Sequence, residues 1–303
     1  MGNGFSAPVA DIRRLTIHDG PGTRDTVFVK GCPLHCLWCH NPESISPRPQ
    51  LLFRSRLCVN CGTCAELCPQ KVHLFGEDGH TLARENCLSC GKCAEGCLPG
   101  ALALCGTLLT AEQVIGSVLR DKAFFLNSGG GVTLSGGEPL LYPDFTAEVF
   151  RLLKEEGIST SLDTCGAVPF VAFEKVLPWT DRILFDLKGM DPERHARNTG
   201  RANEGILENL SRLGRLGIPV EIRMPVVPGR NDDLEEFDRA GALLKKLPAV
   251  VSIRLLPYHR AGGKYAVCGM EDAMPETEAP PAEELEALAA ILKRRVAIAV
   301  FCE

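Results

Sequence analysis

Three cysteines, Cys32, Cys36 and Cys39, lie close together in a C-x3-C-x2-C spacing within residues 31–42. Three thiolates on one short loop can bind three irons of a cubane [4Fe–4S] cluster and leave the fourth iron without a protein ligand. An iron of that kind is open to a reactant. Zinc is the alternative occupant, because His35 or His40 could supply the fourth ligand of a zinc tetrahedron.

Eight more cysteines form two runs about 30 residues apart, each with the spacing C-x2-C-x2-C-x3-C. The first run is Cys58, Cys61, Cys64 and Cys68, and the second is Cys87, Cys90, Cys93 and Cys97. Both runs resemble the pattern of bacterial two-cluster ferredoxins, in which the fourth cysteine of each run binds the other cluster. The repeat predicts a ferredoxin-like α+β unit with two further clusters over residues 48–105.

The ferredoxin resemblance also implies how these cysteines divide. One cluster would take Cys58, Cys61, Cys64 and Cys97, and the other would take Cys87, Cys90, Cys93 and Cys68. The second run departs from the pattern, because Leu98 follows its last cysteine and Pro99 comes one place late. Cys105 is a candidate replacement ligand, so the pairing stays open.

Composition bounds the class of protein. The chain has 303 residues and 15 cysteines, and the compartment decides whether such cysteines form disulfides or bind metal. The N-terminus has no apolar signal-peptide core, and no run of about 18 apolar residues occurs. We therefore expect a cytoplasmic protein with no membrane partner, whose clustered cysteines bind metal. A net charge of −5 and a pI near 5.9 argue against nucleic acid as a partner.

The elements that must position the three-cysteine loop begin with two strands over residues 11–30, joined by a turn at 19–22. The second strand leads directly into the loop. Further strands are expected over 131–135, 158–163, 182–187, 219–224, 251–256 and 296–301. Helices are expected over 111–122, where Thr110 is the N-cap, and over 143–156, 169–177, 203–216, 232–247 and 282–294. A segment rich in Glu and Pro, 271–281, is expected to form a surface loop.

This alternation of strands and helices predicts a parallel sheet covered by helices. With about six strands in the repeat, the predicted fold class is α/β, a partial (β/α)6 TIM-like barrel. The barrel would comprise residues 1–47 and 106–303, with residues 48–105 as the insert. Such folds place their chemistry in loops at the carboxyl ends of the strands, where the three-cysteine loop would lie.

A glycine-rich turn, SGGEP at 135–139, follows one of the predicted strands. Its glycines, Gly136 and Gly137, allow the backbone to approach a ligand closely, and Glu138 can accept a hydrogen bond from an amine. The three-cysteine loop followed by this turn resembles the radical S-adenosylmethionine (SAM) superfamily. In that superfamily the amino and carboxylate groups of SAM bind the open iron.

Six further motifs indicate a subfamily. In chain order they are DGPGTR at 19–24, WCHNP at 38–42, LDTCG at 162–166, DLK at 186–188, RMPVVPG at 223–229 and LPYH at 256–259. Together they resemble the activating enzymes of glycyl radical enzymes, from about residue 11 to about residue 265. With the two-cluster insert, the chain resembles the subgroup of activating enzymes that carries such an insert.

The resemblance implies roles for individual residues. The catalytic cluster would be bound by Cys32, Cys36 and Cys39, and SAM would be contacted by Gly136, Gly137, Glu138, Asp186, Lys188 and Arg223. Asp163, Thr164 and Asp186 resemble ligands of a monovalent cation beside SAM, and Asp19 matches a loop that meets the partner's glycine segment. The alternatives are an ordinary ion pair for Asp186 and Lys188, and a turn-forming role for Asp19.

The implied activity is reductive cleavage of SAM to a 5′-deoxyadenosyl radical, which abstracts hydrogen from a glycine of a partner glycyl radical enzyme. The implied cofactors are three [4Fe–4S] clusters, SAM and a candidate monovalent cation, with flavodoxin or ferredoxin as the electron donor. One alternative is another radical SAM oxidoreductase with auxiliary clusters. A second is an electron-transfer iron–sulfur protein, which would leave the three-cysteine loop and the SGGEP turn without a purpose.

Overall fold

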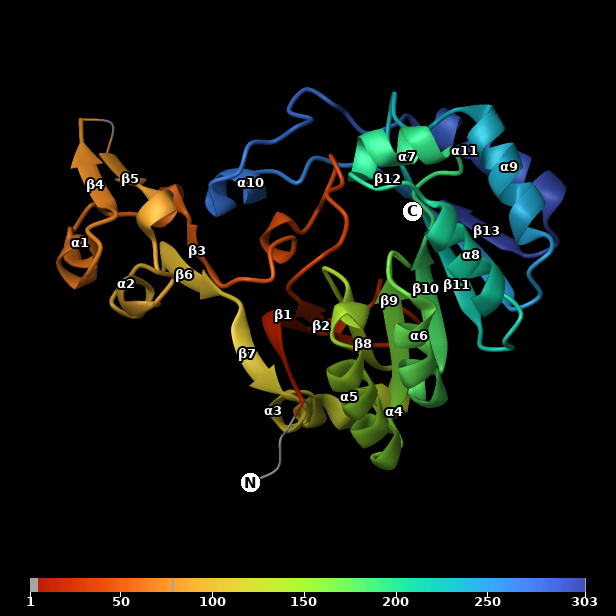
Figure 1. Ribbon diagram of the computed structural model, residues 1–303, viewed down its shortest axis with the longest axis horizontal. Coiled ribbons are helices and arrows are strands. Elements are labelled where there is room, and N and C mark those ends of the chain that lie inside the picture. Colours follow the sequence, from red (N-terminus) through yellow and green to blue (C-terminus); the bar gives the residue numbers. More distant parts are fainter. Residues whose placement is uncertain (1–4, 78, 303) are drawn as a thin grey trace.

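The computed structural model describes residues 5–77 and 79–302, and its main feature is a nine-stranded mixed sheet (Figure 1). The strand order is β13-β12-β11-β10-β9-β8-β2-β1-β7. The strands are β1 (Ser6–Thr16), β2 (Arg24–Val29), β7 (Thr107–Thr110), β8 (Gly131–Gly136), β9 (Ser159–Thr164), β10 (Arg182–Asp186), β11 (Val220–Val226), β12 (Val250–Pro257) and β13 (Ala299–Cys302). From β2 through β8 to β13 the strands run parallel, whereas β1 pairs antiparallel with both of its neighbours, β2 and β7.

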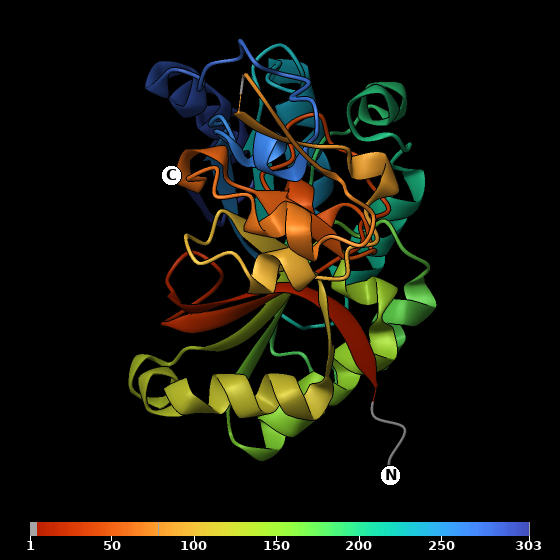
Figure 2. The ribbon, with the colours of Figure 1, turned by 90° about the vertical axis from the view of Figure 1, so that its left-hand side faces the viewer.

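Helices connect the parallel strands and pack along the sheet (Figures 1 and 2). Two described helices, α7 (Pro192–Thr199) and α10 (Lys264–Cys268), contribute no residue to the core of the sheet, and α10 packs against residues 50–53 instead. The helices that pack on the sheet are α3 (Ala111–Val118), α4 (Lys122–Ser128), α5 (Pro143–Glu155), α6 (Phe170–Val176), α8 (Glu204–Leu213), α9 (Leu234–Leu244) and α11 (Ala282–Arg295). Their apolar faces and the strands share one hydrophobic core, in which Val27, Leu134, Phe150, Phe173 and Ile222 are fully buried. Burial of this area is the main source of stability for the sheet.

The predicted alternation of strands and helices is confirmed. The six strands predicted after the insert correspond to β8–β13, and β2 is a seventh parallel strand beside β8. The helix predicted over 111–122 is shorter, because a 3-10 turn at Leu119–Asp121 separates α3 from α4. Its predicted start is correct: the Thr110 hydroxyl accepts from the Gln113 N–H, and the Gln113 side chain accepts from the Thr110 N–H in return.

Residues 50–105 lie beside the main sheet, at the left of Figure 1. Strand β3 (Gln50–Phe53) pairs antiparallel with β6 (Leu102–Cys105), so the two ends of the segment meet. Between them lie α1 (Thr63–Leu67), a hairpin of β4 (His73–Gly76) and β5 (Gly79–Leu82), and α2 (Lys92–Glu95). A separate small core includes buried Leu51, Cys93 and Leu102.

The internal repeat is visible in the backbone of this segment. Gly62 precedes α1 with φ 81° and ψ −14°, and Gly91 precedes α2 with φ 81° and ψ −15°. Both are left-handed conformations that glycine adopts at little cost. The first four residues of the predicted barrel, Asp78 of the predicted insert and Glu303 lie outside the described residues.

Candidate active site

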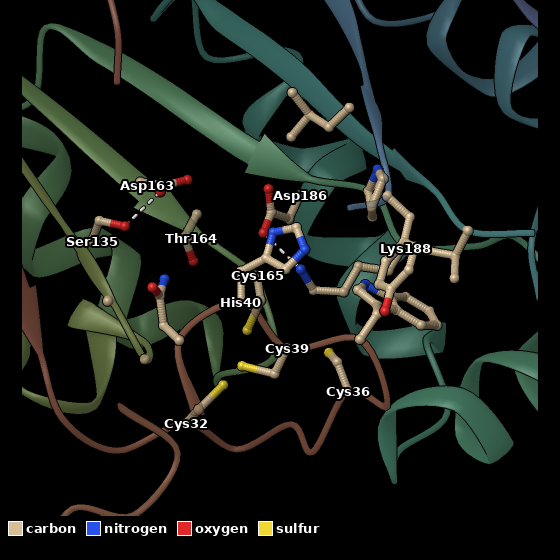
Figure 3. Close-up of a pocket in the computed structure, with 18 of the residues that line it drawn as sticks. Cys32, Cys36, Cys39, His40, Ser135, Asp163, Thr164, Cys165, Asp186 and Lys188 are labelled. Carbon is tan, nitrogen blue, oxygen red and sulfur yellow. Dashed lines mark hydrogen bonds and ion pairs between the residues drawn. The ribbon is translucent and has the colours of Figure 1, made fainter. Parts of the chain in front are cut away.

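The three-cysteine loop begins directly after β2, whose six residues are all buried. The loop backbone is held by neighbouring segments: the N–H of Cys32 donates to the carbonyl of Ile45 at 3.0 Å, and the N–H of His35 donates to the carbonyl of Thr199 at 2.7 Å. The sulfur atoms of Cys32, Cys36 and Cys39 point into one cavity (Figure 3). The fold therefore brings the three predicted ligands together at a common space.

That cavity has a volume of about 450 Å³ and lies at the carboxyl ends of five parallel strands, β8 to β12. Besides the three cysteines, its lining includes Gly136, Gly137, Asp163, Thr164, Asp186 and Lys188, all predicted as site residues. Its lining also includes Trp38, His40, Ser135, Cys165, Val227, Leu256, Tyr258 and His259. A volume of this size suits a small organic ligand, and the mixture of apolar and charged walls suits one with both kinds of surface.

The glycines of the SGGEP turn are needed for its close packing against the backbone next to the three-cysteine loop. A Cβ on Gly136 would lie 2.4 Å from the carbonyl oxygen of Val29, and one on Gly137 would lie 2.0 Å from that of Gly31. The glycines are thus required for the close approach of the turn to the three-cysteine loop. The N–H of Gly137 donates to the Val29 carbonyl at 2.9 Å, and that of Glu138 donates to the Gly31 carbonyl at 2.8 Å.

Glu138 itself is fully buried and is not among the residues that line the cavity, so its contact with SAM stays a prediction. Its carboxylate accepts from the Thr164 hydroxyl at 2.9 and 3.0 Å, from the Cys165 N–H at 2.9 Å and from the Leu140 N–H at 3.0 Å. Burial raises the pKa of this carboxyl, while these hydrogen bonds oppose the rise. Glu138 therefore connects the SGGEP turn to the end of β9.

Charged side chains occupy the far wall of the cavity (Figure 3). Lys188 Nζ lies 2.6 Å from Asp186 Oδ2. These two residues therefore form an ion pair, which was the alternative to a direct contact with SAM. Asp163 accepts a 2.6 Å hydrogen bond from Ser135. Burial raises the pKa of Asp163 to about 7; Asp186 adds to the rise and Arg223 opposes it.

Arg223 and Asp19 do not line this cavity. The Arg223 guanidinium donates to the carbonyl of His18 at 2.6 Å and lies 3.6 Å from Asp163 and 3.8 Å from Asp19. The Asp19 carboxylate also accepts from Thr26 at 2.7 Å. Arg223 therefore fixes Asp163 and the residues next to the turn at 19–22, and its contact with SAM stays a prediction.

A segment that sequence reasoning did not single out holds the three-cysteine loop from the other side. The Tyr265 hydroxyl, on α10, donates to the carbonyl of Cys39 at 2.9 Å, and Lys264 Nζ donates to that of His40 at 2.6 Å. His40 Nε2 contacts the carbonyl of His259 at 2.7 Å. Each of these contacts joins residues more than 200 positions apart in the sequence, so no local sequence pattern predicts it.

The thiols of the loop are strongly affected by their surroundings. Burial raises the pKa of Cys36 to about 12 and that of Cys39 to about 11, whereas a hydrogen bond with Cys165 lowers the pKa of Cys32. Cys165 is itself buried in the cavity wall, as expected for a free thiol. Binding a metal requires thiolates, so occupation of this site releases protons.

The spacing of the sulfur atoms bears on which metal fits. Four ligands about 2.3 Å from one zinc ion would lie about 3.8 Å apart. Among the described residues, only the ligand atoms of Cys64, His73 and His80 all lie within 4.8 Å of one another. The sulfur atoms of the three-cysteine loop do not all lie that close together. The soft thiolate donors and their wider separation fit a cluster whose irons occupy separate corners.

Eight of the nine cysteines in residues 50–105 gather around two small pockets. Cys58, Cys61, Cys64 and Cys97 line one, and Cys68, Cys87, Cys90 and Cys93 line the other. Cys105 lines neither: its sulfur lies 4.0 Å from Lys30 Nζ and 3.9 Å from the carbonyl of Ala10.

Comparison with known proteins identifies the class. The model of the radical SAM superfamily matches residues 99–240, and a model described as a 4Fe-4S single cluster domain matches residues 18–168. A radical SAM methyltransferase from Sphaerobacter thermophilus has a similar fold, with a TM-score of 0.55, 16% identity, and coverage of 98% of this chain and 77% of that chain. The chain has the α/β fold of the radical SAM superfamily, and its cofactors are a [4Fe–4S] cluster and SAM.

Curated relatives narrow the class further. The (2S)-3-sulfopropanediol dehydratase activating enzyme of Klebsiella oxytoca is 39% identical, over 86% of this chain and 85% of the relative. The trans-4-hydroxy-L-proline dehydratase activating enzyme of Clostridioides difficile is 39% identical, over 92% and 93%, and the benzylsuccinate synthase activating enzyme of Thauera aromatica is 38% identical, over 95% and 90%. The chain belongs to the family of glycyl-radical-enzyme activating enzymes. None of its described helices combines the length and apolarity that crossing a membrane requires.

Proposed function

We propose that this chain binds SAM in the cavity above Cys32, Cys36 and Cys39 and directs hydrogen abstraction to a glycine of a partner glycyl radical enzyme. The observation that carries the proposal is the arrangement of three sulfur atoms facing a cavity of about 450 Å³ at the carboxyl ends of parallel strands. Cys32, Cys36 and Cys39 would hold the cluster, which would supply the one electron needed to cleave the carbon–sulfur bond of SAM so that hydrogen can be removed from the glycine. The protein itself binds and orients SAM, and it excludes water from the cavity.

Individual residues would divide this work. The backbone of Gly136 and Gly137 would contact the methionine end of SAM, because both line the cavity next to the three-cysteine loop. Asp186 and Lys188 would face the ribose and carboxylate from the opposite wall. Glu138 and Arg223 would act indirectly, by fixing Thr164 and Asp163 respectively.

A monovalent cation at Asp163, Thr164 and Asp186 belongs to the same proposal. Each carboxylate already has a partner, because Arg223 lies 3.6 Å from Asp163 and Lys188 lies 2.6 Å from Asp186. The Thr164 hydroxyl is also directed to Glu138. A cation would have to displace some of these contacts, so equal SAM affinity in sodium, potassium and tetramethylammonium buffers would argue against it.

The proposal includes a ferredoxin-like insert at residues 48–105 with two auxiliary [4Fe–4S] clusters, and a flavodoxin or ferredoxin as the electron donor. Support comes from the two pockets, each lined by four cysteines in the division that the ferredoxin pattern implies. Three clusters require about 12 irons per chain. Iron and sulfide analysis of the anaerobically reconstituted protein tests this count, and about four irons would overturn the two auxiliary clusters.

The activity is tested with a partner glycyl radical enzyme, chosen as the one encoded beside this gene. Reduced chain and SAM should produce 5′-deoxyadenosine and a glycyl radical in the partner, detected by electron paramagnetic resonance (EPR). Cys32→Ala should abolish both. Formation of neither product by the intact chain would favour a simple electron carrier, and activation retained by Cys32→Ala would disprove the catalytic assignment.

Asp19→Asn tests the contact with the partner's glycine segment, because it should raise the partner concentration needed for activation and leave SAM binding unchanged.

A further inference from the structure

Two buried histidines lie beside the pocket of Cys58, Cys61, Cys64 and Cys97. His73, on β4, is 5% exposed and His80, on β5, is 8% exposed. The His80 ring stacks on Phe75 at a centroid distance of 4.5 Å and contacts Phe53 at 4.5 Å. Burying two imidazoles in so small a core is costly unless they have hydrogen-bond partners.

The contacts of this pair determine where its protons lie. His80 Nδ1 is 3.4 Å from the sulfur of Cys58. His80 Nε2 is 2.9 Å from His73 Nδ1 and 3.9 Å from the sulfur of Cys64, so its short contact is with His73. A cysteine that binds iron is a thiolate and can only accept, so His80 Nδ1 must carry the hydrogen. The neutral His80 ring then accepts at Nε2 from the N–H at His73 Nδ1.

A metal ion held by the histidines is the competing explanation, since ligand atoms of Cys64, His73 and His80 lie within 4.8 Å of one another. Two nitrogens bound to one tetrahedral zinc at about 2.0 Å would be about 3.3 Å apart. The facing nitrogens of His73 and His80 are closer, at 2.9 Å, which is a hydrogen-bond distance. Cys64 also belongs to the first cysteine run. The geometry favours a hydrogen-bonded chain over an ion.

The second cysteine pocket lacks this arrangement. Its described lining consists of Leu51, Cys68, Pro69, Gln70, Val72, Cys87, Leu88, Ser89, Cys90, Gly91 and Cys93, without an imidazole. The sulfur of Cys87 accepts from the backbone N–H of Ser89 at 3.4 Å. The two halves of the repeat therefore share a backbone and differ in side-chain donors to sulfur.

We propose that His80 donates a hydrogen bond to Cys58 and raises the reduction potential of the cluster held by Cys58, Cys61, Cys64 and Cys97 above that of its neighbour. A donor to a cluster thiolate stabilises the more negative, reduced state, which is how surrounding hydrogen bonds tune such clusters. His73 is a positioning residue that fixes the orientation of His80. The inference rests on the two auxiliary clusters of the proposed function.

The test uses a Cys32→Ala/Cys36→Ala/Cys39→Ala background, so that only the auxiliary clusters contribute to the EPR signal. His80→Leu and His80→Asn are matched in size, but only asparagine has an N–H that can reach the sulfur. In an EPR-monitored redox titration, His80→Leu should lower one midpoint by at least about 59 mV, a tenfold change in the reduced-to-oxidised ratio. The other midpoint should stay fixed, and His80→Asn should remain close to the parent.

Further measurements keep the inference separate from the proposed function. About eight irons per chain in this background, without zinc, support the clusters; one zinc per chain or no iron would overturn cluster and inference together. About eight irons per chain, with the same redox midpoints in His80→Leu and in the parent, would disprove the hydrogen-bond inference and leave the two auxiliary clusters in place. Should His80→Leu fail to assemble, pulsed EPR of the parent decides, because an imidazole ¹⁴N coupling and an exchangeable proton are expected and their absence would refute the hydrogen bond.

Discussion

At the scale of single residues, Glu138 is a motif residue whose observed hydrogen bonds are all with the protein itself. Its carboxylate has four hydrogen bonds, to Leu140, Thr164 and Cys165, and none of them leads into the cavity. Hydrogen bonds to a buried charged group each contribute about 1.5 to 3 kcal/mol. Glu138 therefore determines where the SGGEP turn and the end of β9 lie relative to each other.

We predict that Glu138→Gln weakens SAM binding by about 10- to 100-fold while leaving the cluster of the three-cysteine loop intact. The amide presents N–H groups where Thr164 and Cys165 also donate, so about one charged hydrogen bond is lost. Titration of the reduced protein with SAM, followed by the change in the cluster EPR signal, gives the affinity. Glu148→Gln, which alters a surface pair with Arg151, is the control. Wild-type affinity in Glu138→Gln would contradict this reading.

A second buried carboxylate, Asp25, affects stability rather than binding. Its Oδ1 accepts from the Leu15 N–H at 2.9 Å, whereas Oδ2 is buried without a hydrogen-bond partner. Burial raises the pKa of Asp25 to about 6, and Asp121 adds to the rise. The folded pKa exceeds the unfolded one, so folding favours the protonated form. The stabilisation is complete below the unfolded value and is lost as pH rises through about 6.

Asp25→Asn should remove this pH dependence, because the amide is neutral at every pH. At pH 7.5 the variant should be more stable than wild type by about 1 to 2 kcal/mol, since one pKa unit corresponds to about 1.4 kcal/mol. At pH 4 the difference should shrink. Apparent melting temperatures of both proteins, measured anaerobically at the two pH values, test this. The exposed Asp11→Asn is the control, and a gain that is the same at both pH values would count against the prediction.

At the scale of elements, the five-residue helix α10 has a larger role than its length suggests. Through Tyr265 and Lys264 it binds the backbone of the three-cysteine loop. On its other side, the guanidinium of Arg84 donates to the carbonyl of Val267 at 2.9 Å and also bonds to the carbonyl of Leu51 on β3. The helix thus lies between the three-cysteine loop and residues 50–105.

Tyr265→Phe should loosen the three-cysteine loop without unfolding the sheet. One hydrogen bond to the carbonyl of Cys39 is lost, at about 1 kcal/mol, which corresponds to roughly fivefold in an equilibrium. We expect iron from this loop to be released about five times faster to a chelator, as followed by the loss of visible absorbance. Tyr258→Phe is the matched control, because within residues 5–77 and 79–302 no hydrogen bond is found for that hydroxyl, and its ring packs in the Trp38 cluster. Equal rates of iron release from Tyr265→Phe and wild type would contradict a stabilising role for this hydrogen bond.

At the scale of the whole molecule, local patterns predicted some features and not others. The strand and helix alternation was readable because α5, α8 and α11 have long amphipathic patterns and the strands are apolar. Helix α7 was missed because Pro192–Thr199 is strongly polar, although Asp191 at its N-cap and Gly200 after its end mark its limits. Helix α10 was missed because its five residues are too few to show a period.

The site divides in the same way. Cysteine spacing and the glycine turn are local, so the sequence alone located both. Which side chains hold them depends on distant contacts, such as Tyr265 with Cys39 and Glu138 with Thr164, which exist only after the sheet has formed. Arg223 lies in the middle of β11, which continues to Val226, two residues beyond the predicted end of the strand. Its orientation toward His18 and Asp19 depends on the antiparallel β1–β2 pair.

The positions of the cysteine pockets suggest an order for electron flow through the molecule. Cys87 lines the second pocket and also a neighbouring cavity that includes Cys268 of α10. Since α10 contacts the three-cysteine loop, the second pocket is the one joined to the active site through this helix. The first pocket, with His80, includes neither Cys268 nor any other residue of α10 in its described lining.

Cys93→Ala should therefore separate two kinds of reduction. Cys93 lines the second pocket and does not line the cavity above Cys32. SAM cleavage driven by dithionite should therefore stay within about twofold of wild type, because a small reductant can reach the active site directly. With reduced flavodoxin as the donor, the same variant should lose at least tenfold, because the route past α10 is broken. The exposed Cys302→Ala is the control. Loss with both reductants would mean that the cluster supports the fold of the active site, and loss with neither would mean that electrons reach the three-cysteine loop by another path; either result would contradict a relay through residues 50–105.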